Sequence, residues 1–191
     1  MTVDVGTGDG RAILDAARDP RTLAIGLDAS ASAMADASRR AARSARRGGL
    51  PNAAFILAAA EAPPAELCGV ASLVTVRFPW GSLLRGCLGR DEAVARGVAT
   101  LLARNGTLEL LLAPAARDGL EGLPTAPGAT VAAAAGAFEP HGLVLVEGRQ
   151  ATTAEVLASG SSWARRLGAG RRGAASERAV TFVRFARPVR R

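Results

Sequence analysis

Three glycines follow a short valine-containing run near the start of the chain, in the sequence VDVGTGDG from Val3 to Gly10. Glycine adopts positive φ angles without steric cost and lets the backbone approach a ligand closely. In an open α/β sheet, ligands bind beyond the carboxyl ends of the strands, where a turn of this kind would lie. The segment lacks the Gly-Lys-Ser/Thr triplet of a phosphate-binding loop, so it does not predict a nucleoside triphosphate site.

Two acidic residues stand at comparable places farther along the chain. Asp28 ends the run LAIGLD, roughly 20 residues beyond the glycines, where a carboxylate can accept hydrogen bonds from both ribose hydroxyls. Glu61 follows the run AAFILAA, where backbone and side chain could meet an adenine edge. Because the carboxyl ends of parallel strands meet at one edge of a sheet, these segments predict a single crevice for a nucleoside-containing ligand.

The sequence FPWGSLL places one of the two tryptophans, Trp80, directly after a proline at the end of an apolar run. Pro79 fixes φ and lacks a backbone donor, so it is suited to ending a strand and presenting Trp80 at the sheet edge. An enzyme that modifies a Watson–Crick edge must unstack the base, and stacking on an aromatic face returns roughly 1–3 kcal/mol per base. Trp163 could reach the same crevice from the segment before the last strand. The alternative for either tryptophan is packing in the core.

The elements that must position these residues follow an alternating β-α pattern. Branched apolar runs predict strands over 2–5, 23–28, 53–59, 71–78, 106–113, 142–148 and 179–186, and helical patterns cover 11–18, 30–47 and 91–102. The alternation predicts a Rossmann-like α/β fold with a mostly parallel seven-stranded sheet and an antiparallel last strand. The Pro- and Gly-rich stretch 113–128 is expected to be a loop within one domain spanning 1–191.

The charge of the chain points to a nucleic acid. There are 24 basic and 17 acidic residues, a net charge of +7, and every basic residue is arginine, whose planar fork matches phosphate oxygens. A GC-rich genome would also favour arginine over lysine. Two clusters are expected to bind RNA: Arg39, Arg40, Arg43, Arg46 and Arg47 on the helix 30–47, and Arg165, Arg166, Arg171 and Arg172 around Trp163. The alternative is that these are solvated faces.

Other chemistries find little support. Cys68, Cys87 and the single histidine, His141, are too few for a zinc site or a disulfide scaffold, so no metal and a reduced, cytoplasmic compartment are expected. The longest alanine run, 132–135, is broken by Gly136 and is too short to span a bilayer, so no membrane association is expected.

Five segments together carry a resemblance that runs in order from Val3 to about Arg172: VDVGTGDGR, IGLD, GGLPNAAFILAAAEAPPAEL, VRFPWGSLL and SSWARRLGAGRR. They resemble the aminoglycoside-resistance 16S rRNA adenine-N1 methyltransferases of the kanamycin–apramycin type. FPWGSLL and SSWARRL are more specific than the glycine turn, which all methyltransferases of this fold that use S-adenosylmethionine (SAM) share. The resemblance implies SAM as methyl donor and the decoding-site adenine of the 30S ribosomal subunit as acceptor, with the protein acting as a monomer.

The resemblance also implies residue roles. The SAM pocket would be lined by Asp4, Gly6, Thr7, Gly8, Asp28, Ala59, Ala60, Glu61 and Ser82, and the catalytic set would be Phe78, Pro79, Trp80, Ser161 and Trp163. Ser161 would lie near the donor, and the two tryptophans would hold the target base. Adenine N1 carries a lone pair and no proton, so attack on a sulfonium methyl group needs no general base and catalysis should rest on positioning.

Two departures from that family pattern stand out. Family members usually begin with a hairpin before the first strand, whereas here the glycine motif starts at Val3, so that element is expected to be absent or to have been removed. Gly173 stands where the family tends to have a further arginine. Two alternatives remain open: a methyltransferase of the same fold acting on tRNA or a small metabolite, and a non-catalytic RNA-binding relative.

Overall fold

The computed structural model describes residues 1–114, 122–160 and 179–189. In these parts of the chain, seven strands form one sheet in the order β3-β2-β1-β4-β5-β7-β6. The strands are β1 (Thr2–Val5), β2 (Ala24–Asp28), β3 (Ala53–Leu57), β4 (Ala71–Arg77), β5 (Leu102–Leu112), β6 (Val144–Gln150) and β7 (Thr181–Ala186). Strands β3, β2, β1, β4 and β5 are parallel, and β7 runs antiparallel to both β5 and β6. The predicted fold class is therefore confirmed.

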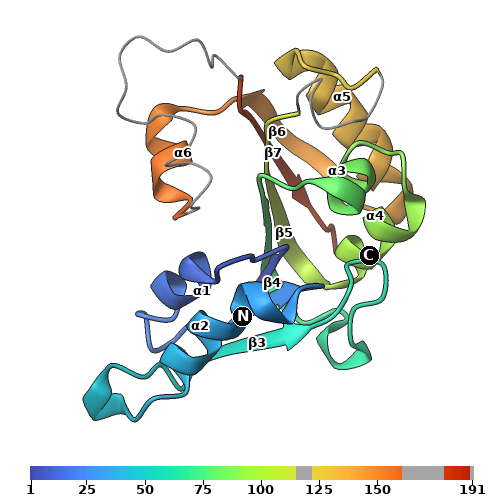
Figure 1. Cartoon of the computed structure of the whole chain (residues 1–191). Coiled ribbons are helices and arrows are strands. Elements are labelled where there is room, and N and C mark those ends of the chain that lie inside the picture. Colours follow the sequence, from blue (N-terminus) through green and yellow to red (C-terminus); the bar gives the residue numbers. More distant parts are fainter. Residues whose placement is uncertain (115–121, 161–178, 190–191) are drawn as a thin grey trace, which may run out of the picture.

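Helices cover both faces of this sheet (Figure 1). On one face lie α1 (Arg11–Ala16), α2 (Ala31–Ala41) and α6 (Thr153–Ala158), and on the other lie α3 (Gly81–Cys87), α4 (Glu92–Thr100) and α5 (Pro127–Phe138). Three short 3-10 helices complete the described elements: η1 (Ala45–Arg47), η2 (Ala65–Leu67) and η4 (Glu139–His141). Within the described ranges, no helix combines the length and apolar character needed to cross a bilayer.

The core lies between the sheet and the helices α3, α4 and α5. Valines of the two central strands are fully buried, and the rings of Phe138 and Phe185 pack with centroids 5.4 Å apart. Val3 and Val5 of β1 and Val74 and Val76 of β4 face this core, and the residues that alternate with them, Asp4, Thr75 and Arg77, lie on the opposite face. The central strands are thus held firmly, and their carboxyl ends can present side chains from a fixed frame.

The helix predicted over 30–47 is wrong in its second half. Helix α2 ends at Ala41, Ser44 is extended with φ −58° and ψ 150°, and the 3-10 helix η1 follows. The chain turns back through two glycines so that the Leu50 amide donates to the Ala41 carbonyl, 2.9 Å away, at the end of the helix. Gly48 caps η1 rather than α2, and a Cβ atom on Gly49 would lie 1.7 Å from the Arg43 carbonyl oxygen, so the glycines permit this return of the chain. The first arginine cluster therefore spans a helix end, a turn and η1, not one helix.

Other elements were missed or begin elsewhere. The patterns did not predict α3, α5 or α6, and α5 begins at Pro127, inside the stretch expected to be a loop. The predicted helix 91–102 ends at Thr100, and β5 starts at Leu102, earlier than expected. Helix α4 is capped at its start by Asp91, whose Oδ1 accepts from the Val94 amide at 3.3 Å.

Helix α4 makes a close approach to the loop that follows β3. A Cβ atom placed on Gly97 would lie 2.0 Å from the carbonyl oxygen of Ala60. The contact cannot be relieved by a side-chain rotation, because the contacting atom is a backbone carbonyl oxygen. The glycine thus sets how near α4 lies to the loop Ala59–Glu61.

We predict that Gly97→Ala will shift this loop and destabilise the fold by about 1–3 kcal/mol, the usual cost of overpacking. Gly136→Ala is the matched control, since Gly136 is an exposed position of α5 with no atom within 4 Å of its added Cβ. Alanine there should stabilise the helix by about 0.5–1 kcal/mol. Urea unfolding of both variants is the measurement. Equal effects of the two substitutions would contradict the close approach.

Candidate active site

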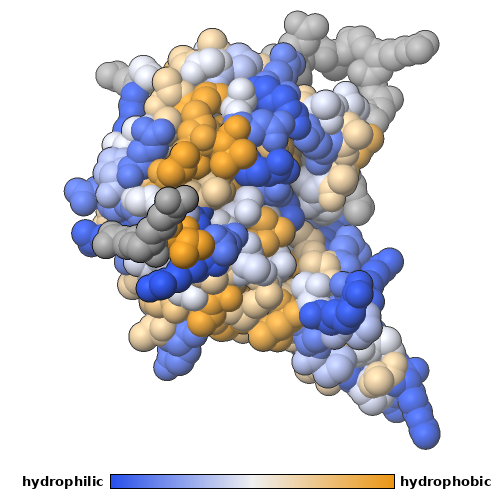
Figure 2. Space-filling view, turned by 180° about the vertical axis from the view of Figure 1, so that it is seen from behind, coloured by the Kyte–Doolittle hydropathy of each residue, from blue (hydrophilic) through white to orange (hydrophobic). Residues whose placement is uncertain are grey.

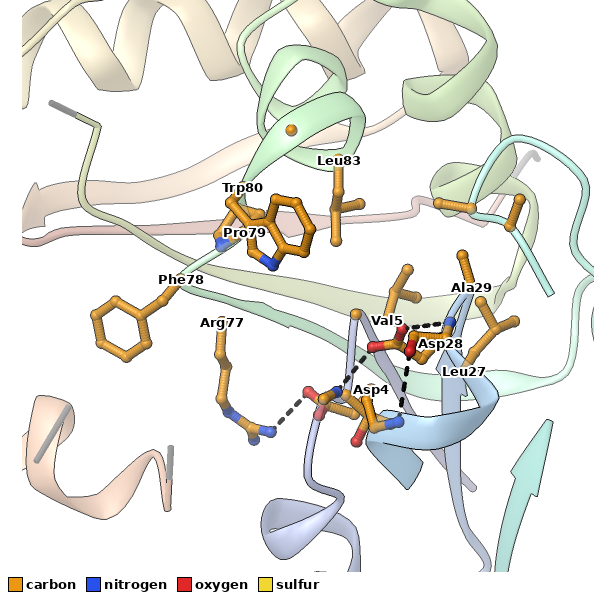
Figure 3. Close-up of a pocket in the computed structure, with 18 of the residues that line it drawn as sticks. Asp4, Val5, Leu27, Asp28, Ala29, Arg77, Phe78, Pro79, Trp80 and Leu83 are labelled. Carbon is orange, nitrogen blue, oxygen red and sulfur yellow. Dashed lines mark hydrogen bonds and ion pairs between the residues drawn. The ribbon is translucent and has the colours of Figure 1, made fainter. Parts of the chain in front are cut away.

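A cavity of about 380 Å³ opens at the carboxyl ends of β1, β2, β3 and β4 (Figure 3). This volume suits a ligand of nucleoside size or somewhat larger. The described residues that line it include the predicted Asp4, Gly6, Thr7, Gly8, Asp28, Ala59, Ala60, Glu61, Phe78, Pro79, Trp80 and Ser82. The structure thus brings together every described residue that the sequence assigned to donor binding or catalysis.

The glycine turn forms one wall of the cavity. Gly8 and Gly10 have φ angles of 55° and 66°, in the left-handed region that side chains disfavour. A Cβ atom on Gly10 would also lie 2.4 Å from the Phe55 ring and 2.6 Å from the methyl group of Ala37. Glycine is therefore required here both by backbone conformation and by the closeness of β3 and α2.

Asp28 links this turn to the next strand. Its Oδ2 accepts from the Gly8 amide and its Oδ1 from the Ser30 amide, each at 2.8 Å. A carboxylate oxygen has two acceptor sites, so each oxygen keeps one for an incoming hydroxyl group. Two adjacent hydroxyls on a ribose ring fit this pair of acceptors.

The loop after β3 forms the far end of the cavity. The Ala58 amide donates to the Asp28 carbonyl at 3.0 Å, and the Ala62 amide donates to the Ala59 carbonyl at 3.1 Å. Glu61 is exposed at the rim. With α4 packed behind it, this short turn is fixed beside Asp28, as a site for an adenine edge requires.

At the opposite end, Asp4 is 4% exposed and its Oδ1 accepts two hydrogen bonds. The donors are Thr75 Oγ1 at 2.5 Å and Arg77 Nη1 at 2.7 Å. Neither Thr75 nor Arg77 was identified from the sequence. Their alternation on a strand that follows the glycine turn is the signal that could have found them, because it places both on one face beside β1.

The segment after β4 carries the predicted tryptophan. Phe78 has φ 50°, a conformation that costs roughly 1–2 kcal/mol for a residue with a side chain. Its ring is 7% exposed and packs with Leu111, Val180 and Phe182, while its amide donates to the Leu111 carbonyl at 2.8 Å. The strained backbone is therefore held by a buried anchor, and Phe78 supports the loop rather than offering a free aromatic face.

Trp80 follows two residues later and is 80% exposed. It precedes the first turn of α3 in an extended conformation, so core packing is excluded for this tryptophan. Figure 3 shows its ring across the cavity from Asp4 and Asp28, next to Pro79. An uncovered indole beside a nucleoside-sized cavity is free to stack on a second ring.

Helix α6 closes another side, where Ser159 and Gly160 reach the cavity. The helix begins with a capping box: Thr152 Oγ1 accepts from the Glu155 amide, and Glu155 Oε2 accepts from the Thr152 amide. Arg149 of β6 grips Glu155 with two bonds of 2.8 and 2.6 Å and also donates to Glu147 at 2.7 Å. The wall formed by α6 is thus tied to the sheet by charge.

That ionic network extends across three strands. Arg184 of β7 contacts Glu109 of β5 and Glu147 of β6, each at 3.0 Å. The guanidinium groups of Arg149 and Arg184 lie 4.9 and 5.0 Å from the centroid of the Phe182 ring. Several charges that share partners hold geometry better than one isolated surface pair.

Several predicted residues fall outside the described ranges. They are Ser161, Trp163, Arg165, Arg166, Arg171 and Arg172, together with Gly173. The base-holding role of Trp163 and the second arginine cluster therefore remain predictions from the sequence.

The first arginine cluster covers the last turn of α2 and the connection to β3, which enters the sheet at the edge opposite the cavity. All five arginines are exposed, and Arg39 pairs with Asp36. Arg39, Arg40 and Arg43 line a second hollow together with Arg11. The connection with η1 projects at the lower left of Figure 1, and Figure 2 shows hydrophilic side chains along the same projection from behind. Ala42 and Ala45 follow the end of the helix and are exposed.

The described parts of the chain contain neither a reactive thiol at Cys87 nor a cluster of metal-ligating residues. Burial raises the pKa of the Cys87 thiol to about 12, so this group stays protonated. No cluster of three or more histidine, cysteine, aspartate or glutamate residues among them could hold a metal ion.

Comparisons with known proteins agree with this geometry. Residues 1–181 match the family of 16S rRNA (adenine(1408)-N(1))-methyltransferases. The enzyme of that name from Streptoalloteichus hindustanus is 36% identical over 178 residues, which cover 90% of this chain and 81% of that protein.

Solved structures match over nearly the whole chain. The 16S rRNA methyltransferase KamB has a TM-score of 0.83 at 32% identity, covering 98% of this chain and 87% of that one. A tryptophan-to-alanine mutant of the 16S rRNA (adenine(1408)-N(1))-methyltransferase from Catenulisporales acidiphilia, solved with cosubstrate SAM, has a TM-score of 0.84 at 30% identity. That match covers 100% of this chain and 86% of the mutant.

The grip of Arg149 on Glu155 predicts a pH-dependent contribution to stability. The hydrogen bonds from Arg149 and then from Thr152 lower the pKa of Glu155 from 4.5 to about 2. Because the folded pKa lies below the unfolded one, the contribution is present above pH 4.5 and fades as the pH falls toward 2.

We therefore expect Glu155→Gln to lower the melting temperature at pH 7 by about 2–4 °C, with a smaller difference from the parent below pH 4.5. Glu92→Gln is the control, because within the described ranges Glu92 forms a single ion pair, with Arg96 at 3.9 Å. Thermal unfolding between pH 3 and pH 7 checks both. An equal loss from the two variants at pH 7, or a loss independent of pH, would refute the anchoring of α6.

Proposed function

Because the chain belongs to the 16S rRNA (adenine(1408)-N(1))-methyltransferase family, we propose that it transfers a methyl group from SAM to N1 of the decoding-site adenine in the 30S subunit. The observation that carries this proposal is the exposed Trp80 on an anchored loop beside a nucleoside-sized cavity. An enzyme for a small metabolite would have no use for an uncovered indole at the mouth of its donor pocket. A base taken out of its stack needs such a face, because new stacking offsets the free energy lost on unstacking.

The residues present fit SAM. Asp28 would offer two acceptors to the ribose hydroxyls, the turn Ala59–Glu61 would meet the adenine, and Asp4 would offer a carboxylate at the far end. When bound, SAM supplies a methyl group already activated by its positive sulfur. Among the described residues, the acidic side chains that line the cavity are Asp4, Asp9, Asp28 and Glu61, and they favour this cation electrostatically.

The protein's own contribution to the reaction is positioning. Adenine N1 needs no base to remove a proton, which agrees with the place of the single histidine, His141, in η4. Trp80 would stack on the extruded adenine and offset the free energy lost on unstacking, roughly 1–3 kcal/mol per base. Its aromatic face also favours the positive charge that develops on the methylated base. The anchored Phe78 keeps this face in place, which is what an in-line transfer needs.

The arginines at the end of α2 and in the connection to β3 are suited to the phosphate backbone of 16S rRNA. Among the described residues, Arg40, Arg43, Arg46 and Arg47 form no ion pair, so these guanidinium groups can bind phosphate without first leaving a carboxylate. The whole 30S subunit is the proposed substrate, the protein would act as a monomer, and a ribosomal substrate places the reaction in the cytoplasm. A methyl group and a positive charge at the decoding adenine would oppose binding of cationic aminoglycosides.

In the experiment, the protein is incubated with labelled SAM and with 30S subunits, naked 16S rRNA or tRNA. Reverse-transcription stops are then mapped on each RNA. N1 methylation blocks base pairing and therefore stops the transcriptase at the modified adenine. We expect one new stop, at the decoding-site adenine of 30S subunits. Labelling of tRNA alone, or of no RNA at all, would overturn the proposal.

We predict that Trp80→Ala will slow single-turnover methylation of 30S subunits about 10- to 100-fold, as expected from the loss of one stacking partner. Trp80→Phe keeps an aromatic face and should retain most of the rate. SAM affinity, measured by calorimetry, should stay nearly unchanged in both variants. A parent rate in Trp80→Ala would show that this indole does not hold the base.

A further inference from the structure

Helix α6 forms one wall of the cavity without a packed face of its own. The helix has six residues and none of them is buried, and a helix of this length is marginal in water unless other contacts hold it. Its far end nevertheless lies against α1 (Figure 1), because a Cβ atom on Gly160 would lie 3.6 Å from Asp15 Oδ2 and 3.7 Å from Ala12 Cα. Contacts other than burial must therefore fix α6 where Ser159 and Gly160 line the cavity.

Arg149 of β6 supplies such a contact. It donates to both carboxylate oxygens of Glu155, in the first turn of α6, at 2.8 and 2.6 Å, and its Nε donates to Glu147 at 2.7 Å. An arginine that binds a carboxylate through two parallel bonds fixes orientation as well as distance. Arg184 belongs to the same network but pairs with Glu109 and Glu147 and, within the described ranges, with no residue of α6. The bond from Arg149 therefore ties this helix to the sheet.

The same helix covers the anchor of the loop that carries Trp80. Val156 of α6 packs against the buried cluster that contains Phe78 and Phe182, and the Arg149 guanidinium group lies 4.9 Å from the centroid of the Phe182 ring. Phe78 has a strained backbone with φ 50°, and such a conformation persists only where the surrounding structure enforces it. Release of α6 would uncover this cluster and loosen the loop.

We propose that Arg149 is a positioning residue for methyl transfer, which fixes α6 against the Phe78 cluster and so holds two walls of the cavity, α6 and the Trp80 loop, in one arrangement. This inference rests on the proposed function. The two walls come from segments far apart in the chain, so no local signal sets the distance between them.

The position of Arg149 separates its effect on the rate from donor binding. It is not among the described residues that line the cavity, so it acts through α6 and the Phe182 ring. Asp28 and the glycine turn lie at β2 and β1, away from this contact. A displacement of about 1 Å in a reacting geometry can slow a reaction about 100-fold. Loss of Arg149 should therefore lower the rate of transfer while leaving the affinity for SAM nearly unchanged.

The test compares Arg149→Met with Arg184→Met in single-turnover methylation at saturating 30S subunits and in calorimetric titration with SAM. Both substitutions remove a guanidinium group that lies over the Phe182 ring, at 4.9 and 5.0 Å, but within the described ranges only Arg149 binds α6. Arg149→Met should slow methylation about 10- to 100-fold and change the SAM affinity by no more than about threefold. Arg184→Met should keep the rate within about threefold of the parent. Arg149→Lys should recover part of the rate, since it restores the charge without the fork.

A second readout follows Trp80 without any reaction. Trp80 and Trp163 are the two tryptophans of the chain, so Trp163→Phe leaves Trp80 as the single indole fluorophore. In that background, Arg149→Met should lower the fluorescence anisotropy of Trp80 because the loop becomes more mobile, whereas Arg184→Met should leave it unchanged. Thermal unfolding of all variants shows that they are folded. If Arg149→Met does not fold, Glu155→Gln weakens the same contact from the side of the helix and should give the same pattern.

The outcomes separate this inference from the proposed function. A parent rate in Arg149→Met, equal slowing by Arg184→Met, or an unchanged anisotropy of Trp80 would overturn the positioning role while leaving the proposed methyl transfer intact. A loss of SAM affinity as large as the loss of rate would make Arg149 a structural residue and overturn the role as well. If the parent methylates no RNA, the proposed function fails, and with it the role of Arg149 in the reaction.

Discussion

The site depends on the two hydrogen bonds that Asp28 accepts from the backbone. Through the Gly8 amide its carboxylate holds the glycine turn after β1, and through the Ser30 amide it holds the start of α2. Hydrogen bonds to an ionised group are worth about 1.5–3 kcal/mol, so one side chain fixes two loops that would otherwise move independently. The remaining lone pairs of the carboxylate are then held in fixed positions for the hydroxyl groups of a ligand.

Around Asp28, the ends of neighbouring strands carry different parts of the site. The strand order places β1 between β2 and β4, so the proposed donor would have its nucleoside end at β2 and β3 and its other end at β4. The same strand β4 continues into Phe78, whose strained backbone is held by its buried ring and delivers Trp80 to the rim. In the proposed reaction, donor binding and base stacking would share one strand, which favours reproducible alignment of the reacting atoms.

Much of this arrangement could be predicted from the sequence, because it depends on local signals at strand ends. Asp28 and Glu61 each follow an apolar run, and parallel strands bring such ends together. The features that could not be predicted from the sequence depend on tertiary structure. The end of α2 is set by the return of Leu50 to Ala41, which alanine periodicity does not reveal. Arg77 was missed because its pairing with Asp4 follows from the register between two strands far apart in the chain.

The central claim is that Asp28 both builds the glycine turn and holds the donor's ribose, and titration of Asp28→Asn with SAM tests it most directly. Both carboxylate oxygens accept backbone amides, so the amide nitrogen of asparagine must face one of these donors and lose that bond as well as a ribose contact. The account predicts a SAM affinity at least about 10- to 100-fold lower than that of the parent. An unchanged affinity in a folded Asp28→Asn protein would contradict it.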